Sequence, residues 1–579
     1  MSAIIPIKTP GRGRAGRRRR AISAVIPILT SKRGEHASLR SRRVCTIVRW
    51  VSILAISLLA TGGAGAGATT RAEAQARAAV PSGGTVTMPI VGDPIFNPWY
   101  PGVGVESVFP DRVLFDGLTK PGTNGLPAPD LATRWQVSRD GLTWTFALRH
   151  GVTWHDGTAF TSADVVYTFN NVVLNKSLAA SGSSYFLAVA NVRAQGPYTV
   201  IFHLHHPFAA LPAYLGYNAG ILPKHIFNGK NPFKLTSFNK GKPVGTGPFK
   251  MGTYIPDQSV ELVANPHYWG GAPHLHSIVF KVLPDPNAQV AQMLSGELNL
   301  MIVDVGAATA RLKSASNIAL RSEYVPQFYW IALNQNNKLF TDVRVRQAIM
   351  YALNRQAMIA AVARGYATIA NAAISPALRY YYTTDVKNYG YSPALARTLL
   401  AQAGWTAGQG GILRKNGKPF SFVLDVGQKG YLVPIAELVQ SYLKAVGIQV
   451  KLNVMEWNAS IQKDFVQKSY EAVVNWWVYP DDPDVSPFFT SAAANTEENE
   501  PGYRDATLDK LLLAGQQATS PAARRAAYAK VQMYMSQQLP YIFLWFPKEV
   551  QARSTRLHGI PAVGLRDAMN YTAQWYMTP

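Results

Sequence analysis

The stretch NWWVYPDDPDVSPFF, residues 475–489, packs three aspartates and three prolines into fifteen positions. Asp481, Asp482 and Asp484 are close enough in sequence to bring two carboxylates together, and a glycoside hydrolase needs two carboxylates about 5–10 Å apart. A calcium loop fits poorly, because the D-x-D-x-D-G order is absent and the prolines stiffen the chain. Composition alone leaves a secreted hydrolase built on these carboxylates open as a hypothesis.

The same stretch carries Trp476, Trp477 and Tyr479, which are residue types that often form the wall of a binding pocket. Their rings would suit stacking on a sugar ring or contact with an apolar side chain. The whole chain has 13 tryptophans and 27 tyrosines, so many of these rings are expected to lie in hydrophobic cores. The aromatic residues leave the chemical class of a ligand open.

Histidine offers two further candidate sites, and neither has the spacing of a catalytic or metal centre. His155 and Asp156 are neighbours, and adjacent side chains on an extended chain point to opposite faces, so a His-Asp dyad is not expected. The pair Asp156-Gly157 in WHDG predicts a turn instead. His203 and His205 would share one face of a strand, but zinc needs a third or fourth ligand and none stands at a suitable spacing. We therefore predict neither a metal ion nor a cofactor.

The segments that must position these residues follow a basic leader. Residues 1–50 hold thirteen Lys and Arg against one acid, and they supply about half of the formal net charge of +24. A short apolar stretch, VSILAISLLA, then precedes small residues and A-x-A sites, which is the order of a secretory signal. We predict that residues 1–76 are a leader for export, with an uncleaved membrane anchor as the alternative.

The leader also bears on the export route and on the chemistry of the mature chain. No Phe-Leu pair follows Ser41-Arg42-Arg43, so the Sec route is favoured over the twin-arginine route. Cys45, the only cysteine, precedes the apolar core and cannot be a lipobox cysteine. Cleavage would leave no cysteine, which excludes disulfides and thiolate catalysis. The densest basic run lies in this removable part, so we predict no nucleic-acid partner.

Beyond about residue 84, patterns typical of strands and helices alternate, which indicates α/β domains with non-local strand pairing. Alternating apolar residues predict strands at residues 83–92, 141–154 (strand, turn and strand), 198–205, 277–284, 448–454 and 541–546. Apolar residues at helical spacing, with capping signals, predict helices at residues 161–173, 342–365, 394–404, 433–447, 507–516 and 521–538.

Four long stretches carry a resemblance to a known family. They are LPAPDLATRWQVSRDGLTWTFALRHGVTWHDGTAFTSADVVYTF (126–169), ILPKHIF (221–227), PVGTGPFKMGTYIPDQSVELVANPHYWGGAPHLHSIVFKVLPD (243–285) and FTDVRVRQAIMYALNR (340–355). They resemble the solute-binding proteins of peptide-type ABC importers, extracellular solute-binding family 5, which includes dipeptide- and oligopeptide-binding proteins. The resemblance runs from about residue 84 to the C-terminus.

The resemblance implies an α/β fold of the periplasmic binding protein class II type, with two hinged lobes and an extra subdomain on the first lobe. The chain would cross between the lobes at two strands, near residues 323–330 and 539–546. The implied bounds are 84–116, 233–324 and 542–579 for lobe I, 117–232 for the extra subdomain, and 325–541 for lobe II.

The resemblance also implies a ligand site around the opening stretch. Dipeptide and oligopeptide binders have an aspartate there that pairs with the peptide's α-ammonium, and this chain has Tyr479 at that position. Asp481 or Asp482 could take the role if the loop bulges, because a buried ammonium needs a carboxylate. The departure puts free peptides in doubt as ligands.

Two further residues are candidates by the same resemblance. Lys429, in GQKGY, stands where dipeptide binders have an arginine that meets the ligand carboxylate, although a solvated lysine beside a turn explains it equally well. Lysine keeps the positive charge but lacks the planar two-pronged geometry of arginine. Tyr185 is a weaker candidate for the subdomain's side of the cleft, where a plain core or surface aromatic is the simpler explanation.

The resemblance predicts an extracytoplasmic solute-binding protein, in the periplasm or cell envelope, that captures a peptide-like ligand and delivers it to a membrane permease. We expect a monomer without catalytic activity. No G-x-x-x-x-G-K-[ST] stretch occurs, so the importer's ATPase would be a separate subunit. An oligosaccharide or other non-peptide solute stays open because of the aromatic loop, and the hydrolase remains the hypothesis from another class.

Overall fold

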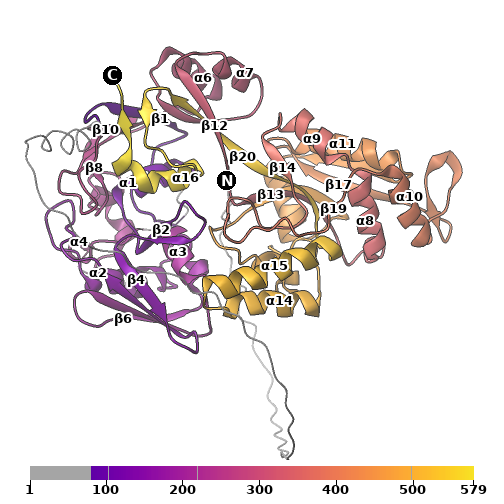
Figure 1. Ribbon diagram of the computed structural model, residues 1–579, viewed down its shortest axis with the longest axis horizontal. Helices are drawn as coiled ribbons and strands as arrows, with labels where there is room; N and C mark the ends of the chain where they lie inside the picture. The colour runs from indigo at the N-terminus through magenta and orange to yellow at the C-terminus, as the bar shows by residue number, and fades with distance from the viewer. Residues whose placement is uncertain (1–79, 102–103, 218–219, 228, 497) are drawn as a thin grey trace, which may run out of the picture. The chain divides into compact units, whose positions relative to one another are not determined.

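The computed structural model describes residues 80–101, 104–217, 220–227, 229–496 and 498–579, and Val80–Pro579 belong to one compact unit. Its larger sheets and their helices alternate along the chain in a mixed α/β arrangement (Figure 1). Within the described ranges, no helix combines the length and the apolar character needed to cross a bilayer. The predicted leader, residues 1–76, lies outside the described residues.

The first sheet is built around the N-terminal strand β1 (Thr85–Ile90). This strand pairs in parallel with β10 (Ser277–Val282), and β9 (Ser259–Ala264) and β8 (Phe249–Ile255) continue the sheet in antiparallel order. Alternate side chains of β1 are buried, as the period of two in its sequence predicts.

A second sheet lies in the part of the chain that was predicted to be the extra subdomain. Its four strands are antiparallel, in the order β4 (Ala132–Val137), β5 (Thr143–Leu148), β7 (Thr199–Leu204) and β6 (Val189–Ala194). Phe146 and Phe202, from the two central strands, are buried with ring centroids 5.4 Å apart.

The third sheet is the largest, and it collects strands from distant parts of the chain. Its members are β11 (Leu300–Val303), β12 (Ile318–Tyr324), β13 (Gln327–Leu333), β14 (Ala367–Ile369), β17 (Ser421–Gly427), β18 (Gln449–Met455), β19 (Ala472–Val478) and β20 (Ile542–Ser554).

The long strand β20 connects two parts of this sheet. Ile542–Trp545 pair with β13, whereas Lys548–Ser554 pair with β12. The chain also passes directly from β12 to β13 through Val325 and Pro326. We call residues 84–324 and 542–579 region A, and residues 325–541 region B. The assignment of these bounds to hinged lobes stays a prediction.

Helices of region B follow the predicted positions closely. Ser392 accepts a hydrogen bond from Leu395 N at the start of α10, and Gly404 follows its end with a φ of +88°. These two residues are the predicted start and stop signals of that helix. The helices that match predictions are α10 (Pro393–Gln402), α11 (Leu432–Lys444), α14 (Ala506–Gln517) and α15 (Pro521–Gln538).

The single helix predicted for residues 342–365 is wrong, because the chain forms two helices there. They are α8 (Val343–Ala352) and α9 (Arg355–Val362), and the side chain of Asn354 accepts a hydrogen bond from Ala357 N to start the second. The Arg355 side chain is buried and donates to the carbonyl oxygens of Ala370, Phe543 and Tyr389. These distant acceptors fix the break, and local periodicity does not reveal them.

Two other sequence predictions are corrected in part. Residues 141–154 form only one strand, β5, because Thr153 makes just an isolated bridge with Ala159. Residues 161–173 are helical as predicted, with a capping box between Thr161 and Asp164, but the α-helix α2 (Ser162–Val166) continues as a π-helix.

The GTGPF and WHDG motifs meet in region A. A Cβ atom at Gly245 would lie 1.8 Å from the carbonyl oxygen of Leu114, so this backbone approach requires glycine. Gly245 N donates to His155 Nδ1 at 3.1 Å, and Nε2 lies 3.0 Å from the Gly247 carbonyl oxygen. Burial lowers the pKa of His155 to about 4, so the ring is neutral. The predicted structural role of the WHDG turn is confirmed.

Candidate functional site

The predicted site residues of region B lie at one edge of the third sheet. Strands β18, β17 and β19 run parallel, so their carboxyl ends meet at the same edge. Lys429 follows the end of β17, Trp457 follows the end of β18, and Trp476 lies near the end of β19. Ligands of open α/β sheets bind outside the carboxyl ends of parallel strands. We call this edge the carboxyl edge.

A stack of rings runs across the carboxyl edge. The Trp476 ring lies 5.4 Å from that of Trp457, nearly parallel at 13°, and 5.7 Å from that of Tyr329. Tyr329 in turn stacks on Trp545 at 5.5 Å. The Lys429 ammonium lies 4.6 Å from the centre of the Trp457 ring, as a cation–π pair. The structure therefore brings Lys429 and Trp476 together, through a tryptophan that the sequence analysis missed.

Trp477 faces the other side of β19, because neighbouring residues of a strand point to opposite faces. Its indole Nε1 donates to the Tyr541 hydroxyl at 3.2 Å, and its ring stacks on Phe488 at 4.9 Å. It also packs against the buried Trp330 at 5.6 Å. Trp476 and Trp477 were predicted as one wall, but the structure places them on opposite faces of the strand.

Tyr479 lies in the core of region B with 1% of its surface exposed. Its hydroxyl donates to the Ala373 carbonyl oxygen at 3.0 Å and accepts from Ser375 N at 2.7 Å. Burial raises the pKa of this hydroxyl, so it stays protonated. Its hydrogen-bonding capacity is used within the protein, and its role toward a ligand stays a prediction.

Asp482 and Asp484 make contacts within region B that hold the loop on which they lie. Arg524, on α15, donates from both terminal nitrogens to the Asp482 carboxylate, at 2.6 and 2.7 Å, and all of these atoms are buried. Asp484 accepts from Ser486 N and from Gln516 Nε2, each at 3.1 Å. Neither carboxylate is free to act as an acid or a base, so the geometry gives the hydrolase hypothesis no support.

Asp481 makes its ion pair with region A instead. Its carboxylate lies 2.5 Å from Arg566 Nη2, and the same guanidinium contacts Asp567 at 2.8 Å. Burial raises the pKa of Asp481 to about 7; Arg566 opposes this rise and the neighbouring Asp567 adds to it. Arg566 comes from α16 (Leu565–Ala568), and nothing in its sequence neighbourhood indicates this partner.

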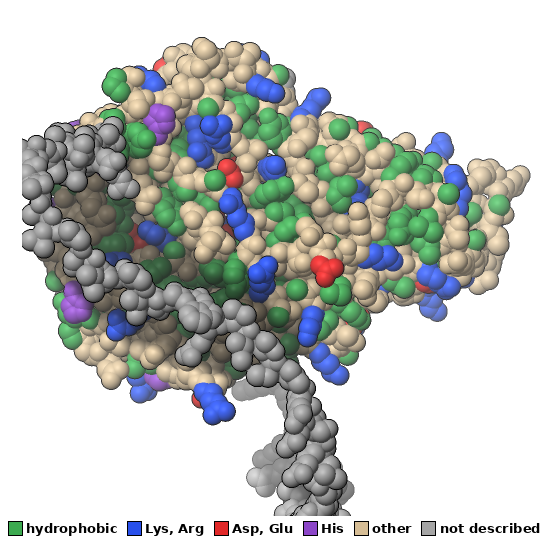
Figure 2. Space-filling view, viewed as in Figure 1, with side chains coloured by type: hydrophobic (Ala, Val, Ile, Leu, Met, Phe, Trp, Pro, Cys, Tyr) green, Lys and Arg blue, Asp and Glu red, His purple; other side chains and the backbone are tan. Residues whose placement is uncertain are grey.

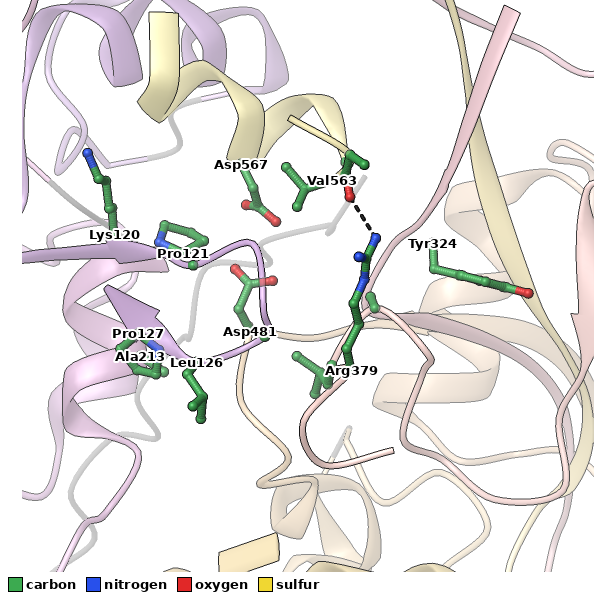
Figure 3. Close-up of a pocket in the computed structure, with 16 residues that line it drawn as sticks. Lys120, Pro121, Leu126, Pro127, Ala213, Tyr324, Arg379, Asp481, Val563 and Asp567 are labelled. Carbon is green, nitrogen blue, oxygen red and sulfur yellow. Dashed lines mark hydrogen bonds between the residues drawn. The ribbon is translucent and has the colours of Figure 1, made fainter. Parts of the chain in front are cut away.

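A pocket lies beside this ion pair, between regions A and B (Figure 3). In Figure 3 the carboxyl groups of Asp481 and Asp567 face one another, and Arg379 reaches across to the carbonyl oxygen of Ala562, at 2.8 Å. The free space is about 30 Å³, which is room for a water molecule or two. Residues that line it include Lys120, Pro121, Leu126, Pro127, Tyr324 and Val563.

Tyr185 lies on the region A side of the same cluster. Its ring makes edge contacts with Tyr214 at 5.4 Å and Tyr217 at 5.8 Å, and the Arg566 guanidinium lies 4.2 Å over the Tyr217 ring. Tyr185 is therefore linked to Asp481 through Tyr217 and Arg566, and its contact with a ligand stays a prediction. No group of three metal-binding side chains occurs among the described residues.

Comparison with known proteins adds to this geometry. The model of the protein family described as "Bacterial extracellular solute-binding proteins, family 5 Middle" matches residues 127–500. Oligopeptide-binding protein AppA of Bacillus subtilis (strain 168) is 30% identical over 545 residues, which cover 93% of this chain and 99% of that protein. The dipeptide-binding protein of Escherichia coli (strain K12) is 29% identical over 446 residues, which cover 72% of this chain and 80% of that protein.

The solved structure of B. subtilis AppA in complex with a nonapeptide superimposes with a TM-score of 0.68 at 30% identity. The superposition covers 86% of this chain and 100% of that one. The predicted fold class, α/β of the periplasmic binding protein class II type, is confirmed by this likeness. The chain belongs to family 5 of the bacterial extracellular solute-binding proteins.

Proposed function

We propose that the protein is the solute-binding component of an ABC importer, which captures a peptide-like solute between regions A and B. The observation that carries this proposal is the pocket that both regions build, from residues 120–127 and 562–567 on one side and residues 377–379 and 481 on the other. The near full-length relationship to an oligopeptide-binding protein supports a peptide as the solute.

Capture requires the two regions to separate, because about 30 Å³ of free space cannot hold a peptide. Opening would break the Asp481–Arg566 ion pair, the Arg379 contact with Ala562, and the hydrogen bond from the Tyr431 hydroxyl to the Val305 carbonyl oxygen at 2.9 Å. Strand β20 and the Val325–Pro326 link would remain as hinges. A ligand favours the closed form only by binding it more tightly than the open form.

The remaining expectations form part of the same proposal. The protein would work outside the cytoplasm as a monomer, would leave its solute chemically unchanged, and would pass it to a permease driven by a separate ATPase. On the face in Figure 2, Lys and Arg side chains are spread singly over regions A and B. This spread supports a partner other than nucleic acid, which would favour one gathered basic surface.

Native mass spectrometry of the protein purified from its host tests the proposal. We expect a retained ligand with the mass of a peptide, released without chemical change. A retained sugar would favour the oligosaccharide alternative, and release of a cleaved product would revive the hydrolase hypothesis. Either result would contradict the proposal.

A matched pair of tryptophan variants tests where the ligand binds. Trp476→Ala removes a ring from the carboxyl edge and should weaken binding of the recovered peptide about tenfold or more, since aromatic anchors dominate binding surfaces. Trp135→Ala removes a half-buried ring from β4, in the second sheet, and should leave the affinity unchanged. Titration calorimetry measures both, and equal affinities would remove the carboxyl edge from the site.

A further inference from the structure

Regions A and B also line a second cavity, which we call the apolar cavity. Its volume of about 470 Å³ is within the range of about 300–1,000 Å³ that is usual for ligand pockets, whereas the pocket beside Asp481 holds about 30 Å³. Both regions thus build a space that is large enough for part of a solute. The residues that line it are Val305, Gly306, Ala361, Val362, Arg364, Tyr431, Pro434, Glu437 and Leu438.

Two helices of region B form most of this wall. Tyr431 stands immediately before α11, and Pro434, Glu437 and Leu438 share one face of that helix, because residues three and four positions apart lie above one another. The last two residues of α9, an alanine and a valine, lie opposite in the same wall. The helical spacing of these residues therefore places their side chains around one space.

Region A completes the wall with the segment between β11 and α7 (Ala307–Lys313). Val305 and Gly306 belong to this segment, and the Tyr431 hydroxyl donates to the Val305 carbonyl oxygen at 2.9 Å. This hydrogen bond joins the two regions, so the wall of the cavity is complete only when the regions are closed. A Cβ atom added at Gly306 would meet no other atom within 4 Å, which shows that the space beside it is open.

The chemistry of this wall favours an apolar group. Five of the nine lining residues have apolar side chains, and the two charged ones, Arg364 and Glu437, are exposed. Solvent and salt screen exposed charges, so Arg364 and Glu437 would attract a charged group only weakly. An apolar side chain that enters the cavity is removed from water, which is favourable, whereas a polar group needs a hydrogen-bond partner there.

The apolar cavity adjoins the carboxyl edge. Lys429, at that edge, stands two residues before Tyr431, which lines the cavity. Burial raises the pKa of the Tyr329 hydroxyl, and the nearby Tyr431 and Asp304 add to the rise. Tyr329 is a member of the ring stack, so Tyr431 borders both the stack and the cavity. A solute that lies on the rings can therefore extend one of its groups into the cavity.

We propose that the apolar cavity receives a large apolar side chain, such as that of leucine or phenylalanine, from a peptide that lies on the carboxyl edge. The inference rests on the proposed function, because it names the class of peptide that the closed protein prefers. A side chain bound in the cavity contacts both regions at once. Its binding energy therefore favours the closed form over the open one.

A competition between two random nonapeptide libraries tests the inference with the purified protein. The first library is built from glycine, alanine, serine, threonine, asparagine and glutamine, and the second also contains leucine and phenylalanine. Equal amounts are mixed with the protein, and the retained peptides are quantified by mass spectrometry. We expect the second library to be retained about tenfold or more above the first, which is the gain from burying one large apolar side chain.

A matched pair of glycine variants assigns this preference to the cavity. Gly306→Leu adds an apolar side chain at the wall, where the backbone is extended with a φ of 165°, and it should lower the preference to about threefold or less. Gly390→Leu is the control, because a Cβ atom at this exposed glycine also meets nothing within 4 Å. Gly390 lines neither pocket, so the control should keep the preference of the wild type.

The outcomes separate the inference from the proposed function. Equal retention of the two libraries by the wild type, or an unchanged preference in Gly306→Leu, would overturn the inference and leave the proposed function standing. Retention of neither library by the wild type would overturn the proposed function itself. A free apolar compound that copurifies with the wild type and is absent from Gly306→Leu would assign the cavity to a separate ligand, and would also overturn the inference.

A second variant fills the cavity from the other region. Ala361→Leu adds an apolar side chain at the end of α9, where leucine is compatible with the helix, and it should lower the preference in the same way. This variant decides the question if Gly306→Leu retains no peptide at all. A preference in Ala361→Leu equal to that of the wild type would then overturn the inference.

Discussion

Asp481 and Asp482 are neighbours in the sequence, and each pairs with an arginine, yet the two pairs belong to different parts of the molecule. Asp482 binds Arg524 inside region B, where the two side chains are only 3% and 5% exposed. Asp481 binds Arg566 of region A, and these side chains are 14% and 21% exposed. The first pair lies within one region, and the second joins the two regions that the proposed capture of a ligand would separate.

The comparison teaches that the environment of a carboxylate decides its role. In a buried pair with two-pronged geometry, each charge keeps the other from being buried without a partner. Removing one member of such a pair therefore destabilises the fold strongly. A partly exposed pair exchanges its partner for water more easily. A third carboxylate, Asp464, extends the series, because it is buried and makes no ion pair with any residue that the structure describes.

The largest expected effect is on the pair inside region B. Arg524→Ala should lower the free energy of unfolding by about 3–5 kcal/mol, because Asp482 would be left as an unpaired buried charge. Guanidinium denaturation measures the change. Arg525→Ala is the matched control, since Arg525 is exposed and should change stability by no more than about 0.5 kcal/mol. Equal effects of the two substitutions would remove the distinction between buried and exposed arginines.

The buried carboxylate of Asp464 should make the stability of the protein depend on pH. Asp464 is fully buried, its two oxygens have no hydrogen-bond donor among the described residues, and burial together with Asp425 raises its pKa to about 8. The folded protein therefore binds a proton that the unfolded chain releases near pH 4. The stability from this group is complete below about pH 4 and is lost as the pH rises through 8.

Asp464→Asn replaces the protonated carboxyl by a neutral amide and should remove this dependence. For one proton that only the folded protein binds, the free energy of unfolding falls by up to about 1.4 kcal/mol for each unit by which the pH rises. As the pH rises from 6 to 8, the free energy of unfolding of the variant should therefore increase by about 1–2 kcal/mol relative to that of the wild type. Denaturation at several pH values measures the slope, and parallel slopes for both proteins would show that Asp464 is already ionised.

The smallest effect on unfolding is expected at the pair between the regions. Arg566→Gln should lower the free energy of unfolding by about 1 kcal/mol or less, because the pair is partly exposed. It should also shift the protein toward the open form. Small-angle scattering should then report a larger radius of gyration in the absence of ligand. Arg556→Gln, an exposed arginine of the same C-terminal segment, is the control. An unchanged radius would mean that the Asp481 pair does not hold the regions together.

Much of the fold could be predicted because its signals are local or belong to long motifs. The capped helix that begins at Ser392 and the strand YIFLWF follow from propensity and periodicity, and the stretch 126–169 identifies the family. The break at Asn354 could not be predicted, because it depends on carbonyl acceptors that Arg355 finds more than 180 residues further along, at Phe543. Such partners are set by tertiary packing.

The candidate site was predicted less completely. Lys429 and Trp476 do meet at the carboxyl edge, but Trp457 between them was missed, although a tryptophan just past a parallel strand was an available signal. Tyr479 and Asp482 have the residue types of a ligand site, and the structure uses their polar groups within region B.

The amino-acid sequence by itself determined the family, the alternation of strands and helices, and a loop rich in aspartate and tryptophan. These properties depend on residue types and on spacings of a few residues, both of which can be read directly from the sequence. Only the tertiary structure decided which aspartate meets which arginine, because Arg524 and Arg566 lie 42 and 85 residues away from their partners. Charge balance at the pocket is a property of those distant contacts.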